Sequence, residues 1–257
     1  HSVSKIRILF LGTPEFAGRS LEQLLRDSHY DVVDVVTRPN RPAGRKLQLQ
    51  PSPVKTLALA HGLPVFSPET VNTDAFRAQI ASLGAEAGVV VAFGQILAQK
   101  FLDLFPFGCV NVHGSLLPRW RGAAPIQRSL MAGDTETGVC LQKVVRKLDA
   151  GDVLGVRRLQ LDEDMNAVDV YEQLAVLGGD LLHIEFMDYL RGNLMGVEQD
   201  ESLVTIAPKI DKQEARIDWN RTSRDISNQI RGLALGPICW TTRAGATLKV
   251  HQARALI

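Results

Sequence analysis

Short, strongly apolar segments that alternate with helical segments constrain the fold of this chain more than any other feature. Residues 6–11 read IRILFL, and residues 32–36, 87–92 and 109–112 are similarly apolar. Strands that are apolar at successive positions are typical of parallel sheets covered on both faces. The alternation therefore predicts βαβ units and an α/β fold with a doubly wound, mostly parallel sheet.

The segments between these strands have helical periodicity. Helices are expected at residues 54–60 and 73–83 and at about 167–191. For the last of these, Asn166 is placed to cap the amino end, and Gly192 suits the carboxyl end. In doubly wound sheets of this kind, ligands bind beyond the carboxyl ends of the strands.

The pattern changes after Asp200. Residues 206–257 show short strand-like runs around one short helical segment near 226–231, which indicates a small, mostly β unit. The sequence therefore predicts two domains, an α/β domain over residues 5–200 and part of a second, β-rich domain over residues 206–257.

Composition narrows the class of protein. With 45% apolar residues and a net charge of +1, the chain is predicted to be globular, and nucleic-acid binding would have to rest on local clusters of charge. Three cysteines without a CxxC pair favour a cytoplasmic protein without disulfides. No apolar run reaches membrane-spanning length. The six histidines are scattered, His183 has no partner at i+4 in its helix, and we expect no metal site. We expect a monomer.

Two polar residues end one of the apolar strands. Asn111 and His113 are separated by one residue, so their side chains point to the same face of the strand. This places an amide beside an imidazole at the edge where ligands bind. The alternative is a polar strand end whose histidine has only a structural role.

A carboxylate follows in the segment Leu148-Asp149-Ala150-Gly151. Together, three side chains suit the transfer of an acyl-type group to an amine. Asn111 and His113 can stabilise an oxyanion, and His113 or a water molecule held by Asp149 can carry the proton. The alternative for Asp149 is an ordinary polar turn.

These motifs resemble those of the folate-dependent formyltransferase superfamily. The resemblance rests on Asn-x-His followed by Ser-Leu-Leu-Pro, and then on Leu-Asp-x-Gly. It implies a Rossmann-like catalytic domain, 10-formyltetrahydrofolate as cosubstrate, no metal, and catalysis by Asn111, His113 and Asp149.

Other segments resemble the branch of this superfamily that acts on methionyl-tRNA. They lie at residues 12–17, 41–45, 51–55 and 118–127. This resemblance implies that the acceptor is the α-amine of initiator methionyl-tRNA, in translation initiation. It also implies that the second domain is part of an oligonucleotide-binding β-barrel that helps to hold the tRNA.

The resemblance further implies the residues of two binding sites. The folate pocket would be formed by Phe93, Gly94, Ile96, Leu97, Ser115, Leu116, Leu117 and Pro118. The methionyl-tRNA would contact Phe16, Arg41, Arg45, Lys46, Arg119 and Arg121.

Local charge supports the tRNA contacts. No acidic residue occurs between Asp34 and Glu69, and residues 38–53 read as a long, basic, proline-rich loop, which suits contact with phosphates. The resemblance implies that this loop contacts the acceptor stem of the tRNA. A second acid-free interval contains Arg119 and Arg121. The alternative in both places is a solvated surface.

Four other functions are weighed against this one. A nicotinamide-dependent dehydrogenase is disfavoured because Gly12-Thr13-Pro14 replaces the glycine-rich turn. An amino-sugar-nucleotide formyltransferase would share Asn111, His113 and Asp149, although a nucleotide sugar needs no basic loop. A formyltetrahydrofolate hydrolase, in which water replaces the amine, would share the same three residues. A catalytically inactive RNA-binding module would not need those three residues.

Overall fold

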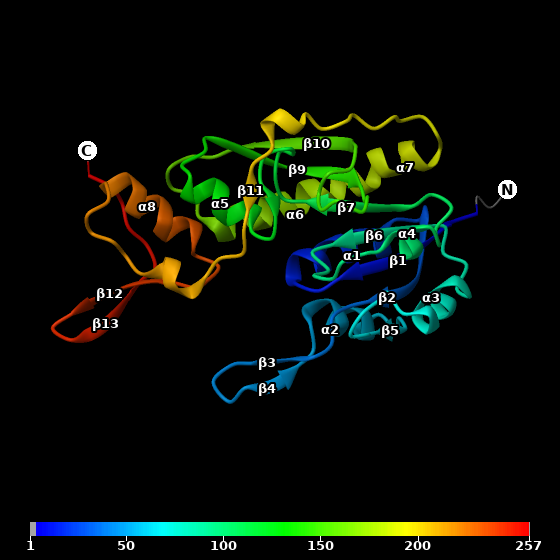
Figure 1. Ribbon diagram of the computed structural model, residues 1–257, viewed down its shortest axis with the longest axis horizontal. Helices are drawn as coiled ribbons and strands as arrows, with labels where there is room; N and C mark the ends of the chain where they lie inside the picture. Colours follow the sequence, from blue (N-terminus) through cyan, green and yellow to red (C-terminus); the bar gives the residue numbers. More distant parts are fainter. Residues whose placement is uncertain (1–3, 257) are drawn as a thin grey trace. The chain divides into compact units, whose positions relative to one another are not determined.

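The computed structural model describes residues 4–256, and its central feature is a seven-stranded sheet (Figure 1). Its strands are β1 (Ile6–Gly12), β2 (Tyr30–Val36), β5 (Val65–Phe66), β6 (Ala87–Val91), β7 (Cys109–His113), β9 (Glu136–Lys143) and β10 (Val153–Gln160). They lie in the order β10-β9-β7-β6-β1-β2-β5. Pairing is parallel from β7 through to β5 and antiparallel between β7 and β9. The predicted α/β class with a mostly parallel sheet is confirmed.

The helices follow the predicted alternation. They are α1 (Glu15–Arg26), α2 (Pro53–Ala60), α3 (Asp74–Ala81), α4 (Gln99–Leu102), α5 (Pro125–Met131), α6 (Ala167–His183), α7 (Glu185–Leu190) and α8 (Ser223–Gly232). Local sequence explains where several begin. The hydroxyl of Ser52 accepts from the backbone of Lys55 at the start of α2, and Thr73 caps α3 in the same way. No helix within residues 4–256 combines the length and the apolar character needed to cross a membrane.

The single helix predicted at about 167–191 is two helices. Asn166 caps α6 as expected: its side-chain oxygen accepts from the backbone N–H of Asp169, and the Asp169 carboxylate accepts from the backbone N–H of Asn166, each at 3.0 Å. However, α6 ends at His183, and Ile184, whose backbone is distorted from ideal helical angles (φ −105°, ψ −72°), separates it from α7. The break lies next to a contact between His183 and Asp27, which periodicity along one helix cannot reveal. Gly192 then adopts the left-handed conformation (φ +75°) expected of a helix end.

By its internal contacts the chain divides into two compact units. The first unit comprises residues up to His113 together with 140–156 and 175–199. The core beside its sheet includes Leu9, Leu11 and Phe101, all of which are fully buried. From β1 the chain adds strands toward one edge of the sheet (β2, β5), and from β6 it adds them toward the other edge. The strand order therefore reverses between the neighbouring strands β1 and β6. The carboxyl ends of these two strands, and of β7 beside β6, therefore form the edge where a doubly wound sheet binds its ligands.

The second unit comprises residues 114–139, 157–174 and 200–257. Besides α5 and α8, it contains the parallel pair β8 (Arg121–Gly122) and β11 (Ile206–Ala207) and the antiparallel hairpin β12 (Cys239–Arg243) and β13 (Ala246–Val250). Its core includes Ile217, Ile226, Ile230 and Leu233. The short strands expected within residues 206–257 are present as β11, β12 and β13, and α8, which packs on α5, supplies much of this core. Both units are discontinuous in sequence, so the division at 200–206 into two continuous domains stays a prediction.

The predicted basic loop contains a β-hairpin. β3 (Arg41–Ala43) pairs antiparallel with β4 (Gln48–Gln50), and every residue of both strands is exposed. Left-handed φ angles at Gly44 (+73°) and Leu47 (+48°) form the turn. Within the first unit, the hairpin extends away from the parallel strands (Figure 1). The stretch therefore has regular secondary structure where a loop was expected, and its basic residues lie where the sequence predicts.

Candidate active site

The carboxyl end of β7 carries the predicted amide and imidazole. Asn111 pairs with Gln142 of β9, and His113 pairs with Cys140. The side chains of Asn111 and His113 lie on the same face, and that of His113 is only 7% exposed. The strand thus holds both groups at the ligand-binding edge of the sheet.

The loop between β9 and β10 brings Asp149 to the same place. Its carboxylate Oδ1 lies 3.4 Å from Asn111 Nδ2, 3.0 Å from Gln142 Nε2 and 3.7 Å from His113 Nδ1. The carboxylate is also almost fully buried. The structure therefore brings together all three residues that the sequence singles out for catalysis.

The backbone around Asp149 is unusual. Asp149 has a left-handed φ of +52°. This conformation costs a residue with a Cβ about 1–2 kcal/mol relative to the right-handed one. A Cβ added to Gly151 would lie 1.7 Å from the carbonyl oxygen of Lys143, so no other residue fits there without moving the loop. Strain of this kind is found where a functional group has to be aimed.

Two glutamines that sequence analysis missed hold this loop. Gln142 donates to the Asp149 carboxylate, and the Nε2 of Gln199 donates to the carbonyls of Asp149 and Gly151, each at 2.8 Å. Both glutamines are buried. Gln142 carried a signal, since it is a polar residue directly after an apolar run on a strand. Gln199 carried none, because it lies fifty residues from Asp149 in sequence.

Two amide oxygens beside the carboxylate lack partners. Asn111 Oδ1 and Gln142 Oε1 are buried without a hydrogen bond among the described residues. Leaving a buried acceptor unsatisfied costs about 1–3 kcal/mol, so such atoms call for an explanation. An N–H donor from a bound substrate or a water molecule would satisfy them.

The predicted folate residues of the first unit follow β6. Phe93 and Leu97 are buried, Ile96 is 80% exposed, and Gly94 has a φ of +88°. A Cβ at Gly94 would lie 3.0 Å from the guanidinium of Arg38, whose Nε is buried without a partner among the described residues. Arg38 is thus a further polar group at this edge that sequence analysis did not assign to the pocket.

The remaining predicted folate residues, from Ser115 to Pro118, belong to the second unit. Ser115 is fully buried, and its hydroxyl donates to the carbonyl of Arg119 at 2.7 Å. Leu116 packs on the backbone at Gly138, where a Cβ would lie 2.4 Å from its side chain. The segment ends in a cis peptide bond between Leu117 and Pro118. Their part in folate binding stays a prediction.

The predicted substrate arginines of the second unit both have acidic partners. Arg119 forms a two-bond ion pair with Asp134 (2.9 and 2.7 Å) and lies over the ring of Trp120. The hydrogen bond to Asp134 raises the pKa of Arg119. Arg121, with a 4% exposed side chain, pairs with Glu201 at 2.8 Å. The sequence interval that contains Arg119 and Arg121 has no acidic residue, but the fold brings a carboxylate to each arginine. Both arginines therefore have structural roles. Their contact with substrate stays a prediction.

The other predicted substrate residues lie in the first unit. Arg41, Arg45 and Lys46 are exposed in the β3–β4 hairpin. Phe16 is 7% exposed in the first turn of α1, at the carboxyl end of β1. The structure thus leaves the hairpin cations on the surface, while it buries most of the aromatic ring that was expected to line a methionine pocket.

Sequence comparison identifies relatives over almost the whole chain. The formyl transferase family matches residues 4–183, and the formyl transferase C-terminal domain matches residues 209–256. A methionyl-tRNA formyltransferase of Bdellovibrio bacteriovorus is 59% identical over 98% of this chain and 79% of its own length. One of Nitrobacter hamburgensis is 50% identical over 91% of this chain and 76% of its own length.

Structure comparison finds the same fold in more distant proteins. A sugar N-formyltransferase from a Shewanella species has a TM-score of 0.74 at 18% identity and covers 98% of this chain and 99% of its own. A 4-N formyltransferase from Francisella tularensis has a TM-score of 0.75 at 15% identity, with the same coverage. At this level of identity the likeness establishes the fold alone.

Proposed function

The chain belongs to the formyltransferase family, among the methionyl-tRNA formyltransferases, and on that basis we propose that Asn111, His113 and Asp149 transfer the formyl group of 10-formyltetrahydrofolate to methionyl-tRNA. The observation that carries this proposal is that the side chains of Asn111 and His113 both face Asp149 Oδ1 at the ligand-binding edge of the sheet. Asn111 Oδ1 and Arg38 Nε, which are buried without a hydrogen-bond partner among the described residues, support the binding of a polar ligand at this edge.

The chemistry assigns a task to each group. The cosubstrate supplies an activated formyl group bound to nitrogen. The lone pair of the methionine amine forms a new C–N bond, the carbonyl electron pair moves to oxygen, and collapse breaks the old C–N bond. One proton must leave the attacking nitrogen, and one must reach the departing nitrogen. The chain must therefore orient the amine, stabilise the negative oxygen and carry a proton.

Asn111 suits the first two tasks. Its Oδ1 can accept from the attacking amine, which holds the nitrogen lone pair toward the formyl carbon. The N–H of Nδ2 that does not face Asp149 can donate to the developing oxyanion. Donors fixed in a buried site before the reaction begins are worth about 3–4 kcal/mol of barrier each.

His113 and Asp149 suit the proton transfer. The Nδ1 of His113 faces the Asp149 carboxylate, which fixes the ring and leaves Nε2 as its basic nitrogen. Their separation of 3.7 Å is longer than a hydrogen bond, and catalytic bonds of this kind shorten when substrate binds. Nε2 then removes a proton from the amine and returns it to the leaving nitrogen.

The tRNA is held by the exposed cations of the β3–β4 hairpin. Arg41, Arg45 and Lys46 have no acidic residue near them in sequence, and the structure keeps them on the surface. Arg119 and Arg121 are instead paired with Asp134 and Glu201. The hairpin also favours an RNA acceptor over the amino-sugar nucleotide, which would need no such extension.

The test is formyl transfer to two acceptors offered separately, methionyl-tRNA and an amino-sugar nucleotide, with release of free folate followed in both reactions. We expect formyl-methionyl-tRNA alone. The Asp149→Asn variant keeps the shape and tolerates the left-handed backbone, so it should fold normally and lose about 100-fold or more in kcat. Formylation of the sugar, or folate release without an acceptor, would overturn the substrate assignment, and wild-type kcat in Asp149→Asn would overturn the mechanism.

A further inference from the structure

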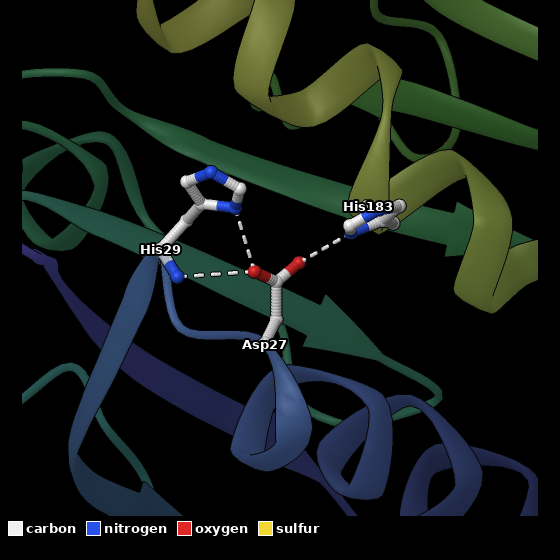
Figure 2. A group of neighbouring side chains, drawn as sticks. All are labelled: Asp27, His29 and His183. Atoms are coloured by element: carbon white, nitrogen blue, oxygen red, sulfur yellow. Dashed lines mark hydrogen bonds and ion pairs between the residues drawn. The ribbon is translucent and has the colours of Figure 1, made fainter.

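Three side chains that play no part in the proposed chemistry meet at the edge of the sheet opposite the active site. Asp27 ends α1, His29 immediately precedes β2, and His183 ends α6 (Figure 2). They therefore lie at the amino end of β2, whereas Asn111 and His113 lie at the carboxyl end of β7, which runs parallel to it through the sheet. Any ligand held here is separate from the catalytic residues.

The two imidazoles face one carboxylate. His29 Nδ1 lies 2.7 Å from Asp27 Oδ1, and His183 Nδ1 lies 2.8 Å from Asp27 Oδ2. The candidate ligand atoms all lie within 4.8 Å of one another. The Asp27 side chain is 2% exposed, while those of His29 and His183 are 37% and 54% exposed. The carboxylate is thus fixed and buried, and the rings close over it from the solvent side.

Surrounding contacts hold the three residues in place. The backbone N–H of His29 also donates to Asp27 Oδ1 at 3.0 Å. The Tyr30 hydroxyl donates to the carbonyl of Leu182 at 2.6 Å, and the Tyr30 ring stacks on Phe186. These bonds join the start of β2 to the junction between α6 and α7. Outer contacts of this kind orient ligands in metal sites.

The charge balance at this place favours a cation. The buried carboxylate of Asp27 accepts from the backbone N–H of His29 and faces both imidazole rings, so the two histidines converge on one carboxylate. In addition, α1 and α6 both end here, and the carboxyl ends of helices carry partial negative charge.

We propose that Asp27, His29 and His183 bind a divalent transition-metal ion, and that zinc is the ion they suit best. Two imidazole nitrogens and one carboxylate oxygen, completed by water, are a common set of zinc ligands. With Zn–N and Zn–O bonds of about 2.0–2.2 Å, tetrahedral ligands lie about 3.3 Å apart. The half-exposed rings would move outward by roughly half an ångström from their present hydrogen bonds to admit the ion. The ion would fasten α1 and β2 to the end of α6.

The experiment is calorimetric titration of the metal-free full chain with Zn²⁺, together with thermal unfolding with and without the ion. We expect one ion per chain and a higher unfolding midpoint in its presence. His183→Gln and His29→Gln replace half-exposed rings, and each should weaken binding at least tenfold. The matched control is His61→Gln, an exposed histidine that ends α2, and it should bind zinc as the wild type does.

A second arm separates this site from the catalytic histidine. Because His113 also lies near a carboxylate, His113→Asn is titrated in parallel and should keep the bound ion. Titration with Co²⁺ in place of Zn²⁺ should give visible absorption bands that disappear in His183→Gln. Absence of saturable zinc binding up to about 1 mM, or equal affinity in wild type and in both His183→Gln and His29→Gln, would show that the cluster is only a hydrogen-bonded tie between helices.

Discussion

The side chain of Gln199 donates a 2.8 Å hydrogen bond to the main-chain carbonyl of Asp149. The same Nε2 also reaches the carbonyl of Gly151. One buried amide thereby fixes both ends of the short turn that aims the carboxylate at His113. This makes Gln199 a positioning residue, since its reach is to the backbone of the loop and not to the reacting atoms.

Replacement of Gln199 by leucine should lower kcat about 10- to 100-fold. The turn would lose two hydrogen bonds of about 1 kcal/mol each, and its strained backbone could relax away from the active geometry. KM for methionyl-tRNA should change little, because the hairpin is untouched. Steady-state kinetics with both substrates varied would measure the two effects separately.

Gln229 provides a matched control for that substitution. It is buried, and its Nε2 donates to the carbonyls of Glu214 and Arg216 in the second unit, in the same two-bond arrangement. Gln229→Leu should lower the unfolding midpoint yet leave kcat near the wild-type value at a permissive temperature. Equal losses of kcat in both variants would mean that Gln199 contributes only to stability.

Gly151→Ala should abolish formyl transfer and destabilise the chain by more than about 2 kcal/mol. The new Cβ would lie 1.7 Å from the Lys143 carbonyl, so the loop that carries Asp149 would have to move. Gly18→Ala is the control, since Gly18 lies within α1 and its Cβ would meet only Leu57 at 3.7 Å. Denaturant unfolding and single-turnover formylation measure both properties. An active, stable Gly151→Ala protein would contradict the geometry of this loop.

Substitution of both Arg45 and Lys46 by alanine should weaken tRNA binding and flatten its dependence on salt. Each phosphate contact that is lost lowers the slope of log K against log salt by about 0.7–0.9. Lys100→Ala, an exposed lysine on α4, should leave both quantities unchanged. Filter binding at several salt concentrations would decide the matter, and an unaltered slope in the double variant would place the tRNA elsewhere.

Asp34→Asn should stabilise the protein at neutral pH but not in acid. Burial raises the pKa of Asp34 to about 6 from an ordinary 3.8, although the backbone N–H of Val35 donates to it. Below pH 3.8 the carboxyl is protonated in both folded and unfolded chains and contributes nothing. As pH rises toward 6, only the unfolded chain ionises it freely, so the folded state loses stability, by up to about 3 kcal/mol.

The asparagine keeps the amide oxygen that accepts from Val35 and carries no charge at any pH. The difference in unfolding free energy between Asp34→Asn and wild type should therefore grow from pH 4 to pH 6 and then level off. Urea unfolding across this range would measure it. A difference that does not vary with pH would show that Asp34 is ionised in the folded protein as easily as in the unfolded chain.

The grouping of Asn111, His113 and Asp149 could be predicted because these residues stand where strand pattern and polar type coincide. Asn111 and His113 interrupt an apolar strand at its carboxyl end, which is where a parallel sheet binds ligands. Two residues after Asp149 comes Gly151, where the turn leaves no space for a side chain. Local pattern was therefore sufficient for the centre of the site.

Residues that act across long sequence separations could not be predicted. The acid-free interval around Arg119 and Arg121 suggested free cations, yet each pairs with a carboxylate outside that interval. Likewise, the sequence of its own helix offers His183 no hydrogen-bond partner, and the side chain instead contacts Asp27, which is 156 residues away. Charge counted along the chain says little about charge in space.

The small size of the β3–β4 hairpin, finally, has a consequence for how the protein binds RNA. Two strands of three exposed residues each have no hydrophobic layer beneath them, and isolated hairpins of that size are only marginally stable in water. Leu47 and Leu49 lie on it 72% and 66% exposed. The hairpin should therefore open and close often in the unbound protein, be the preferred point of proteolytic nicking, and become protected once RNA lies against it. Ordering the hairpin then offsets part of the free energy of RNA binding. Substitutions that stiffen its turn would therefore raise the affinity for RNA without adding a contact.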